Sequence, residues 1–245
     1  NLSGAGTFSI SSVTLTQTVD YVTGALAISA TTSTVNGPGT FRSSTGVTTL
    51  LFSSCVVNSA IVNDGTLRVQ RGGTWSGACT SGTGSTLRIE SELGNASTLT
   101  VASGFTNNGT LELTAISNAG PASLTWNSGT LTNAADASIL LSAGTGGSRT
   151  LTGALSNAGT ITVNAATTLA GSAADHVNTG TGVIDLVAGN LTITQTGLTP
   201  SFTNSGTLTV AAGRTLTVTG GEFVHASPGL SGAGMFSISS VTLTQ

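Results

Sequence analysis

A short motif recurs along this chain: Asn, any residue, Gly, and then a run in which polar and apolar residues alternate. Asn and Gly suit tight turns, and alternating Thr, Leu, Ile and Val suit a strand with one buried side. Copies follow at intervals of about two dozen residues, so each unit must bury its apolar side against its neighbours, and we predict a β-solenoid. The predicted corner turns are Asn63 and Gly65, Asn107 and Gly109, Asn127 and Gly129, Asn157 and Gly159, and Asn204 and Gly206, with a looser copy at Asn178-Thr179-Gly180.

The strands that surround these turns fall into three families, which indicates three walls in each turn of a roughly triangular parallel β-helix. Ten glycines that precede strands divide the chain into about nine to ten coils, all in one continuous domain over residues 1–245. Side chains alternate along a strand, so Leu208 and Val210 both point inward. In this register we expect Leu208 to cover Ile184 and to be covered by Phe236.

The two ends of the chain are nearly identical. Residues 2–17 and 230–245 differ at one of sixteen positions, Thr7 against Met235, at an offset of 228 residues. We therefore predict that the chain is one period, with a short overlap, of a tandem array, and that neither end has a polar cap. Uncapped strand edges invite further stacking, so the expected partner is the protein itself, through covalent continuation and end-to-end or lateral filament association.

Charge is scarce throughout the sequence. Charged residues make up 6% of the chain, every basic residue is Arg, and the formal net charge is −3. Such a weak field gives no reason to expect nucleic acid or an anionic membrane as a partner. No run of 18 apolar residues occurs, so we expect no transmembrane segment. The first residues lack the features of a signal peptide, and we expect the chain to begin within a longer protein.

The repeated Asn-x-Gly-Thr-Leu-Thr-Val coil, as in residues 204–210, resembles the passenger and stalk regions of large bacterial surface proteins. Filamentous haemagglutinin-type adhesins and autotransporter passengers are the families it is most similar to. The resemblance implies a right-handed parallel β-helix, export to the extracellular space or cell surface, and a role in adhesion or in an extracellular matrix. It also allows a host or surface glycan as a partner. It brings no catalytic motif and no cofactor.

The only two cysteines, Cys55 and Cys79, are 24 residues apart, close to the mean length of a coil. Stacked coils lie about 4.8 Å apart, which a disulfide accepts, and a disulfide suits an exported protein. The alternative is a pair of buried free thiols, and both interpretations remain open. A metal site is not expected, because this region has too few ligands.

Two groups of charged residues suggest chemistry. Asp175, His176 and Asp185 raise the hypothesis of a polysaccharide-degrading cleft, since some β-helix enzymes use clustered carboxylates. Neighbouring strand residues point to opposite faces, however, which favours a solvated loop. Arg68, Arg88 and Glu112 should follow one another in successive coils, with Glu90 and Glu92 close by, either as an ion-pair ladder or as a ligand-binding patch.

Pairs of threonines separated by one residue form the last candidate. They are Thr98/Thr100, Thr150/Thr152, Thr192/Thr194, Thr215/Thr217 and Thr242/Thr244, with Ala27, Ser138 and Ala170 as interruptions. Such pairs fit the flat face of an ice- or glycan-binding solenoid, although Thr is also an ordinary outward strand residue. We predict a non-enzymatic structural or adhesive segment of a long extracellular fibre. A binding solenoid is the alternative, and a polysaccharide-degrading enzyme the less favoured one.

Overall fold

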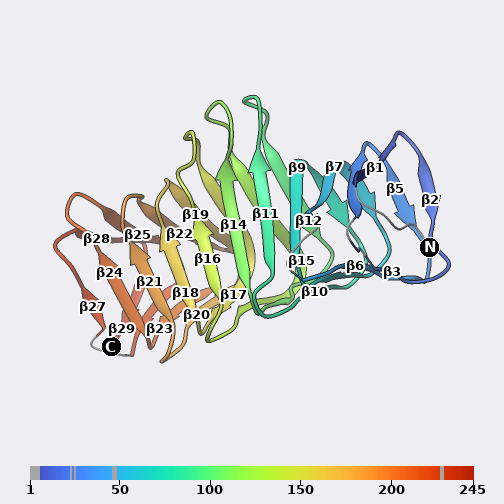
Figure 1. The fold of residues 1–245 in the computed structure, drawn as a ribbon. Helices are drawn as coiled ribbons and strands as arrows, with labels where there is room; N and C mark the ends of the chain where they lie inside the picture. Colours follow the sequence, from blue (N-terminus) through green and yellow to red (C-terminus); the bar gives the residue numbers. More distant parts are fainter. Residues whose placement is uncertain (1–5, 23, 25, 46–48, 227–228) are drawn as a thin grey trace.

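The chain is a rod of stacked coils with its two ends at opposite ends of the stack (Figure 1). The computed structural model describes residues 6–22, 24, 26–45, 49–226 and 229–245. Strands account for 62% of the structure, no helix occurs in the described residues, and the coils make a parallel β-solenoid of about ten turns, about 22 residues apart. The predicted fold class is therefore confirmed.

Each turn contributes strands to three walls, which we name A, B and C in the order in which the chain visits them. Strands of one wall pair in parallel with the strands of the turns before and after. Wall A consists of β1 (Gly6–Ser11), β4 (Leu26–Thr31), the first parts of β7 (Thr49–Val57) and β9 (Thr66–Trp75), β11 (Thr86–Ser91), β14 (Thr110–Ala115), β16 (Ser138–Leu141), β18 (Thr160–Val163), β21 (Val183–Leu186), β24 (Thr207–Val210) and β27 (Leu230–Ser231).

Walls B and C are built in the same way. Wall B consists of β2 (Thr14–Thr16), β5 (Thr34–Asn36), the second parts of β7 and β9, β12 (Ser97–Val101), the first parts of β15 (Ala122–Asn133) and β17 (Arg149–Asn157), β19 (Thr167–Ser172), β22 (Leu191–Thr196), β25 (Thr215–Thr219) and β28 (Met235–Ser239). Wall C consists of β3 (Tyr21–Val22), β6 (Phe41–Ser43), β8 (Ile61–Asn63), β10 (Cys79–Ser81), β13 (Thr106–Asn107), the second parts of β15 and β17, β20 (Asp175–Asn178), β23 (Ser201–Asn204), β26 (Glu222–His225) and β29 (Thr242–Thr244).

The interior of the rod is a narrow, mainly aliphatic core that also contains aromatic residues. Inward side chains such as Leu67, Leu111 and Leu208 are completely buried. Towards the C-terminus the rings of Phe202 and Phe223 stack with centroids 5.3 Å apart. Each coil alone has only one or two apolar residues per wall, so the core exists only because the coils stack.

The register of the last coil differs from the prediction. Leu208 does pair with Ile184, but its other neighbour is Leu230, whereas Phe236 pairs with Leu216 on wall B. The prediction that Phe236 covers Leu208 was wrong, because a glycine before a strand does not identify the wall: the same turn chemistry serves at every corner. The glycines Gly39, Gly129 and Gly234 precede strands of walls C, C and B.

Non-glycine residues in the left-handed backbone region mark one corner in most turns. At the corner between walls A and B these residues are Ser12, Thr32, Ser54, Arg71, Leu93 and Asn118, with φ between 47° and 56°. Towards the C-terminus they lie at the corner between walls B and C instead, at Ala173, Thr199 and Ser240. The tight corner thus moves by one wall along the rod.

Candidate functional site

A ladder of buried asparagine side chains runs inside the corner between walls C and A. Asn107 donates from Nδ2 to Oδ1 of Asn133 at 2.9 Å, and the chain of amides continues through Asn157 (2.8 Å), Asn178 (2.8 Å) and Asn204 (2.7 Å). All five residues are completely buried. The ladder fixes the coil register, because each amide both donates and accepts at the spacing of the coils.

The ladder has further members at both ends. The Ser81 hydroxyl donates to Asn107 Oδ1 at 3.2 Å. A separate pair lies at the same corner, where the Ser43 hydroxyl donates to Oδ1 of Asn63, but Asn63 Nδ2 has no partner and the pair is not joined to Ser81. At the other end Asn204 Nδ2 lies 3.3 Å from Nδ1 of His225. These residues close wall C strands in the pattern apolar-x-Asn, with Ser or His in place of Asn at some positions and His176 in place of the apolar residue before Asn178. That pattern is visible in the sequence, but the Asn-x-Gly motif coincides with it at only five positions, so it does not reveal Ser43, Ser81, Asn133 and His225.

The glycines of the predicted corner turns are required by space. A Cβ on Gly159 would lie 2.2 Å from the carbonyl oxygen of Ala134, and one on Gly206 would lie 2.2 Å from that of Gly182. The same crowding occurs at Gly65 and Gly109, and none of these four glycines has a positive φ. Their role is therefore the close approach of one coil to the next.

One predicted corner turn belongs elsewhere. Asn127 and Gly129 are exposed and lie between walls B and C, and Gly129 has a φ of 68°. In that turn Asn133 occupies the ladder position, and the residue two positions after it is Ala135 where the motif has Gly. The assignment of Asn127 to the same corner as the other four asparagines was wrong.

Wall B carries two long ranks of outward side chains, which we call the threonine face; all of them carry a hydroxyl except Val56 and the predicted interruption Ala170. The first rank is Thr98, Ser123, Thr150, Thr168, Thr192, Thr217 and Ser237. The second is Thr14, Thr34, Val56, Thr74, Thr100, Thr125, Thr152, Ala170, Thr194, Thr219 and Ser239. Spacings are about 4.8 Å along a rank and about 7 Å between ranks.

The threonine face is more regular than the sequence indicated. Ala27 and Ser138 belong to wall A and do not interrupt it, while Ser123 and Thr125 fill a turn that the Thr-x-Thr pattern missed. Two predicted pairs were misplaced: the pair near the C-terminus is Thr217/Thr219, and Thr242/Thr244 lie on wall C. Neither rank contains a charged residue, in contrast to the outward positions of walls A and C.

The predicted ion-pair column is present on wall A. Arg68, Arg88 and Glu112 follow one another in adjacent strands. The fully buried carboxylate of Glu90 accepts two hydrogen bonds from Arg68, at 2.9 and 2.6 Å, and lies 3.3 Å from Arg88. Arg88 pairs in turn with Glu112 at 2.8 Å. Positive and negative groups are matched within the column, which favours a structural role over a site for a charged ligand.

A buried cation, Arg149, secures a loop. The Arg149 guanidinium is completely buried and donates to five backbone carbonyl oxygens, of which those of Ser142, Ala143 and Gly146 lie 2.9 Å away. Burial lowers the pKa of Arg149, and Glu112 opposes that shift. A guanidinium has five N–H groups, so all of its donors find partners here.

The candidate catalytic residues do not form a cleft. Asp185 lies on β21 of wall A, whereas Asp175 and His176 lie on β20 of wall C. His176 points into the core, where Leu155 and Phe202 are its neighbours along the wall, and its ring nitrogens have no hydrogen-bond partner. Burial lowers the pKa of His176 to about 4, against the effect of nearby Asp175.

The two cysteines are free thiols on different walls. Cys55 pairs with Gly73 on wall B and Cys79 with Ile61 on wall C, so a turn here takes 18 residues and an offset of 24 reaches the next wall. Of the two interpretations, the pair of free thiols is the one observed, and the disulfide is not formed.

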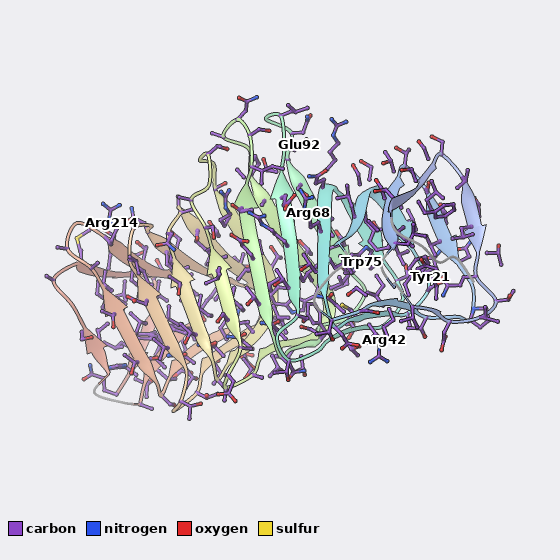
Figure 2. The ribbon with its side chains drawn as sticks, viewed as in Figure 1. Tyr21, Arg42, Arg68, Trp75, Glu92 and Arg214 are labelled. Atoms are coloured by element: carbon purple, nitrogen blue, oxygen red, sulfur yellow. The ribbon has the colours of Figure 1, made fainter. Side chains whose placement is uncertain are left out.

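Trp75 is 1% exposed and lies inside the rod, with its ring centroid 6.0 Å from that of Phe52 (Figure 2).

Within the described ranges, no three His, Cys, Asp or Glu residues gather closely enough to hold a metal ion. The described residues also include no helix long and apolar enough to cross a membrane. Comparison of the chain with protein-family models, curated proteins and solved structures found no match.

Proposed function

We propose that this chain is a structural segment of a long, repetitive extracellular fibre or surface adhesin, without catalytic activity. The observation that carries the proposal is the stacking of coils throughout the described residues, combined with a nearly identical sequence segment at both ends. Main-chain hydrogen bonds between coils and the asparagine ladder both run along the rod axis. Tension along the rod would therefore act on many parallel hydrogen bonds together.

The end coils support continuation of the rod. Ile238 and Leu243 occupy inward-facing positions of the last coil, yet they are 39% and 45% exposed because no further coil covers them in this structure. Such apolar surface is normally covered by another coil. A period of about ten turns adds about 50 Å to the fibre, at about 4.8 Å per turn.

Imaging of the native material tests this proposal. We expect thin fibres whose length is a multiple of about 50 Å, at about ten turns per period. Protease treatment of intact cells should degrade them if they are exposed on the surface. A compact particle, or material that stays protected inside intact cells, would contradict the proposal.

A second function, binding to ice or to a crystalline glycan, is favoured by the threonine face. Its two uncharged ranks offer hydroxyl and methyl groups at the regular spacing that an ordered surface requires. Thermal hysteresis and binding to insoluble cellulose or chitin test it directly. Thr152→Lys, on the threonine face, should abolish binding, whereas Thr162→Lys, on the outward side of wall A, should not. No activity in either assay at high protein concentration would exclude this function.

A further inference from the structure

The duplicated segment occupies different walls at the two ends of the rod. In the first copy Phe8 and Ile10 belong to β1 on wall A and Leu15 to β2 on wall B. In the second copy the equivalent strands are β28 on wall B and β29 on wall C. Ten successive pairings lead from β1 to β27 along wall A, and β28 comes one wall later.

Local geometry is the same in both copies. Ser12 follows β1 with a φ of 56°, and the equivalent Ser240 follows β28 with a φ of 55°. Each therefore forms the tight left-handed corner of its own turn, although one corner lies between walls A and B and the other between walls B and C. The shift follows from the movement of the tight corner along the rod.

The two copies together show both neighbours of the segment. In the first copy the following turn covers it: Phe8 pairs with Ile28 and Leu15 with Val35. In the second copy the preceding turn covers it: Phe236 pairs with Leu216 and Leu243 with Phe223. The open side of the first copy thus has a known complement within the same sequence.

That open side is a hollow of about 300 Å³ at the N-terminal end of the rod, lined by Phe8, Ile10, Leu15, Tyr21 and Phe41 among others. We propose that it is filled by β25 and β26 of a preceding period, with its Leu216, Val218 and Phe223 above Phe8, Ile10 and Leu15. Each period is then rotated by one wall relative to the one before. This inference rests on the proposed tandem fibre and specifies how its periods join.

The rotation changes what the fibre displays. The threonine face lies on wall B in one period, on wall C in the next and on wall A in the third. A fibre therefore presents this face in three directions in turn, and two consecutive periods cannot place it against the same flat surface. The ion-pair column moves in the same way, from wall A in one period to wall B in the next and wall C in the third.

A two-period chain, residues 1–245 followed directly by residues 18–245, tests the junction by cysteine cross-linking. We expect a disulfide between Thr217→Cys and Ser237→Cys, and, in a second variant, between Ser237→Cys and the second-period Ser29→Cys, because Ser9 pairs with Ser29 in the first copy. The Thr217→Cys/Ser237→Cys variant should form at least about tenfold more cross-linked product than a Thr209→Cys/Ser237→Cys variant. Only residues on neighbouring strands of one wall bring their Cβ atoms close enough for a disulfide, and Thr209 lies on wall A. A chain without added cysteines is the control.

The alternative outcomes are distinct. A cross-link between Thr209→Cys and Ser237→Cys would place the duplicated segment on wall A. That result would overturn the rotation but leave the continuous fibre intact. No link between Ser237→Cys and the second-period Ser29→Cys, together with a scattering profile of two separate rods, would overturn both the rotation and the fibre.

Discussion

Replacement of Asn157 by Ala tests whether the asparagine ladder holds the coils in register. Asn157 lies in the middle of the ladder and makes three hydrogen bonds with other coils: it donates to Asn178 Oδ1 (2.8 Å) and to the carbonyl of Val183 (3.1 Å), and it accepts from Asn133 Nδ2 (2.8 Å). Asn157→Ala removes all three and leaves the carboxamide oxygen of Asn178 buried without that donor.

The expected cost follows from these losses. Each hydrogen bond contributes about 1 kcal/mol net, and a buried polar atom left without a partner costs about 1–3 kcal/mol more. We therefore expect Asn157→Ala to lower the free energy of unfolding by about 4–6 kcal/mol. For a chain of this size that corresponds to a decrease in Tm of about 15 °C.

Urea unfolding, followed by circular dichroism and by tryptophan fluorescence, measures the effect. Coincident transitions for the two probes are needed, because long repeat arrays can lose cooperativity. The matched control is Asn127→Ala, at an exposed corner outside the ladder, which should change stability by less than about 0.5 kcal/mol. If the two variants are equally stable, the ladder does not hold the register and the reasoning is refuted.

Three further predictions concern single positions. Gly159→Ala should destabilise the fold strongly or prevent folding, because a Cβ would lie 2.2 Å from a backbone oxygen, whereas Gly180→Ala, with nothing closer than 4.0 Å, should be tolerated in the same thermal melts. The pKa of His176 is about 4 in the fold against 6.5 unfolded, so the unfolded chain binds the proton first as pH falls, and stability should decrease by about 3 kcal/mol between pH 6.5 and 4. That part of the pH dependence should disappear in His176→Leu, and an unchanged slope would disprove the assignment. Burial raises the pKa of Cys55 and that of Cys79, the latter to about 12, and Cys55 is also inaccessible, whereas Cys79 is partly exposed. A thiol reagent should therefore label both far more slowly in the native protein than after unfolding without reductant. If neither Cys55 nor Cys79 reacts after unfolding without reductant, the two are joined in a disulfide and the prediction is wrong.

The sequence determined the fold class, the three strand families and most of the inward residues. Alternation along a strand and the chemistry of a tight turn are local properties, so pairs such as Leu111/Leu113 and Ile161/Val163 could be assigned to the core from the sequence. The ion-pair column of Arg68, Arg88 and Glu112 followed from the same alternation. Asn133 escaped notice, since its turn lacks the glycine on which the motif depends.

Only the tertiary structure decided which wall each strand joins. Coil length varies along the rod, and an Asn-Gly or Ser corner is chemically the same at all three edges, so local chemistry does not say which edge it forms. The separation of Cys55 from Cys79, the continuity of the threonine face and the burial of His176 all depend on that choice. The sixteen-residue segment repeated at the two ends shows the reason most directly, because its strands join walls A and B at one end and walls B and C at the other. Its wall is set by the coils that precede or follow it, and those contacts exist only in the stacked rod.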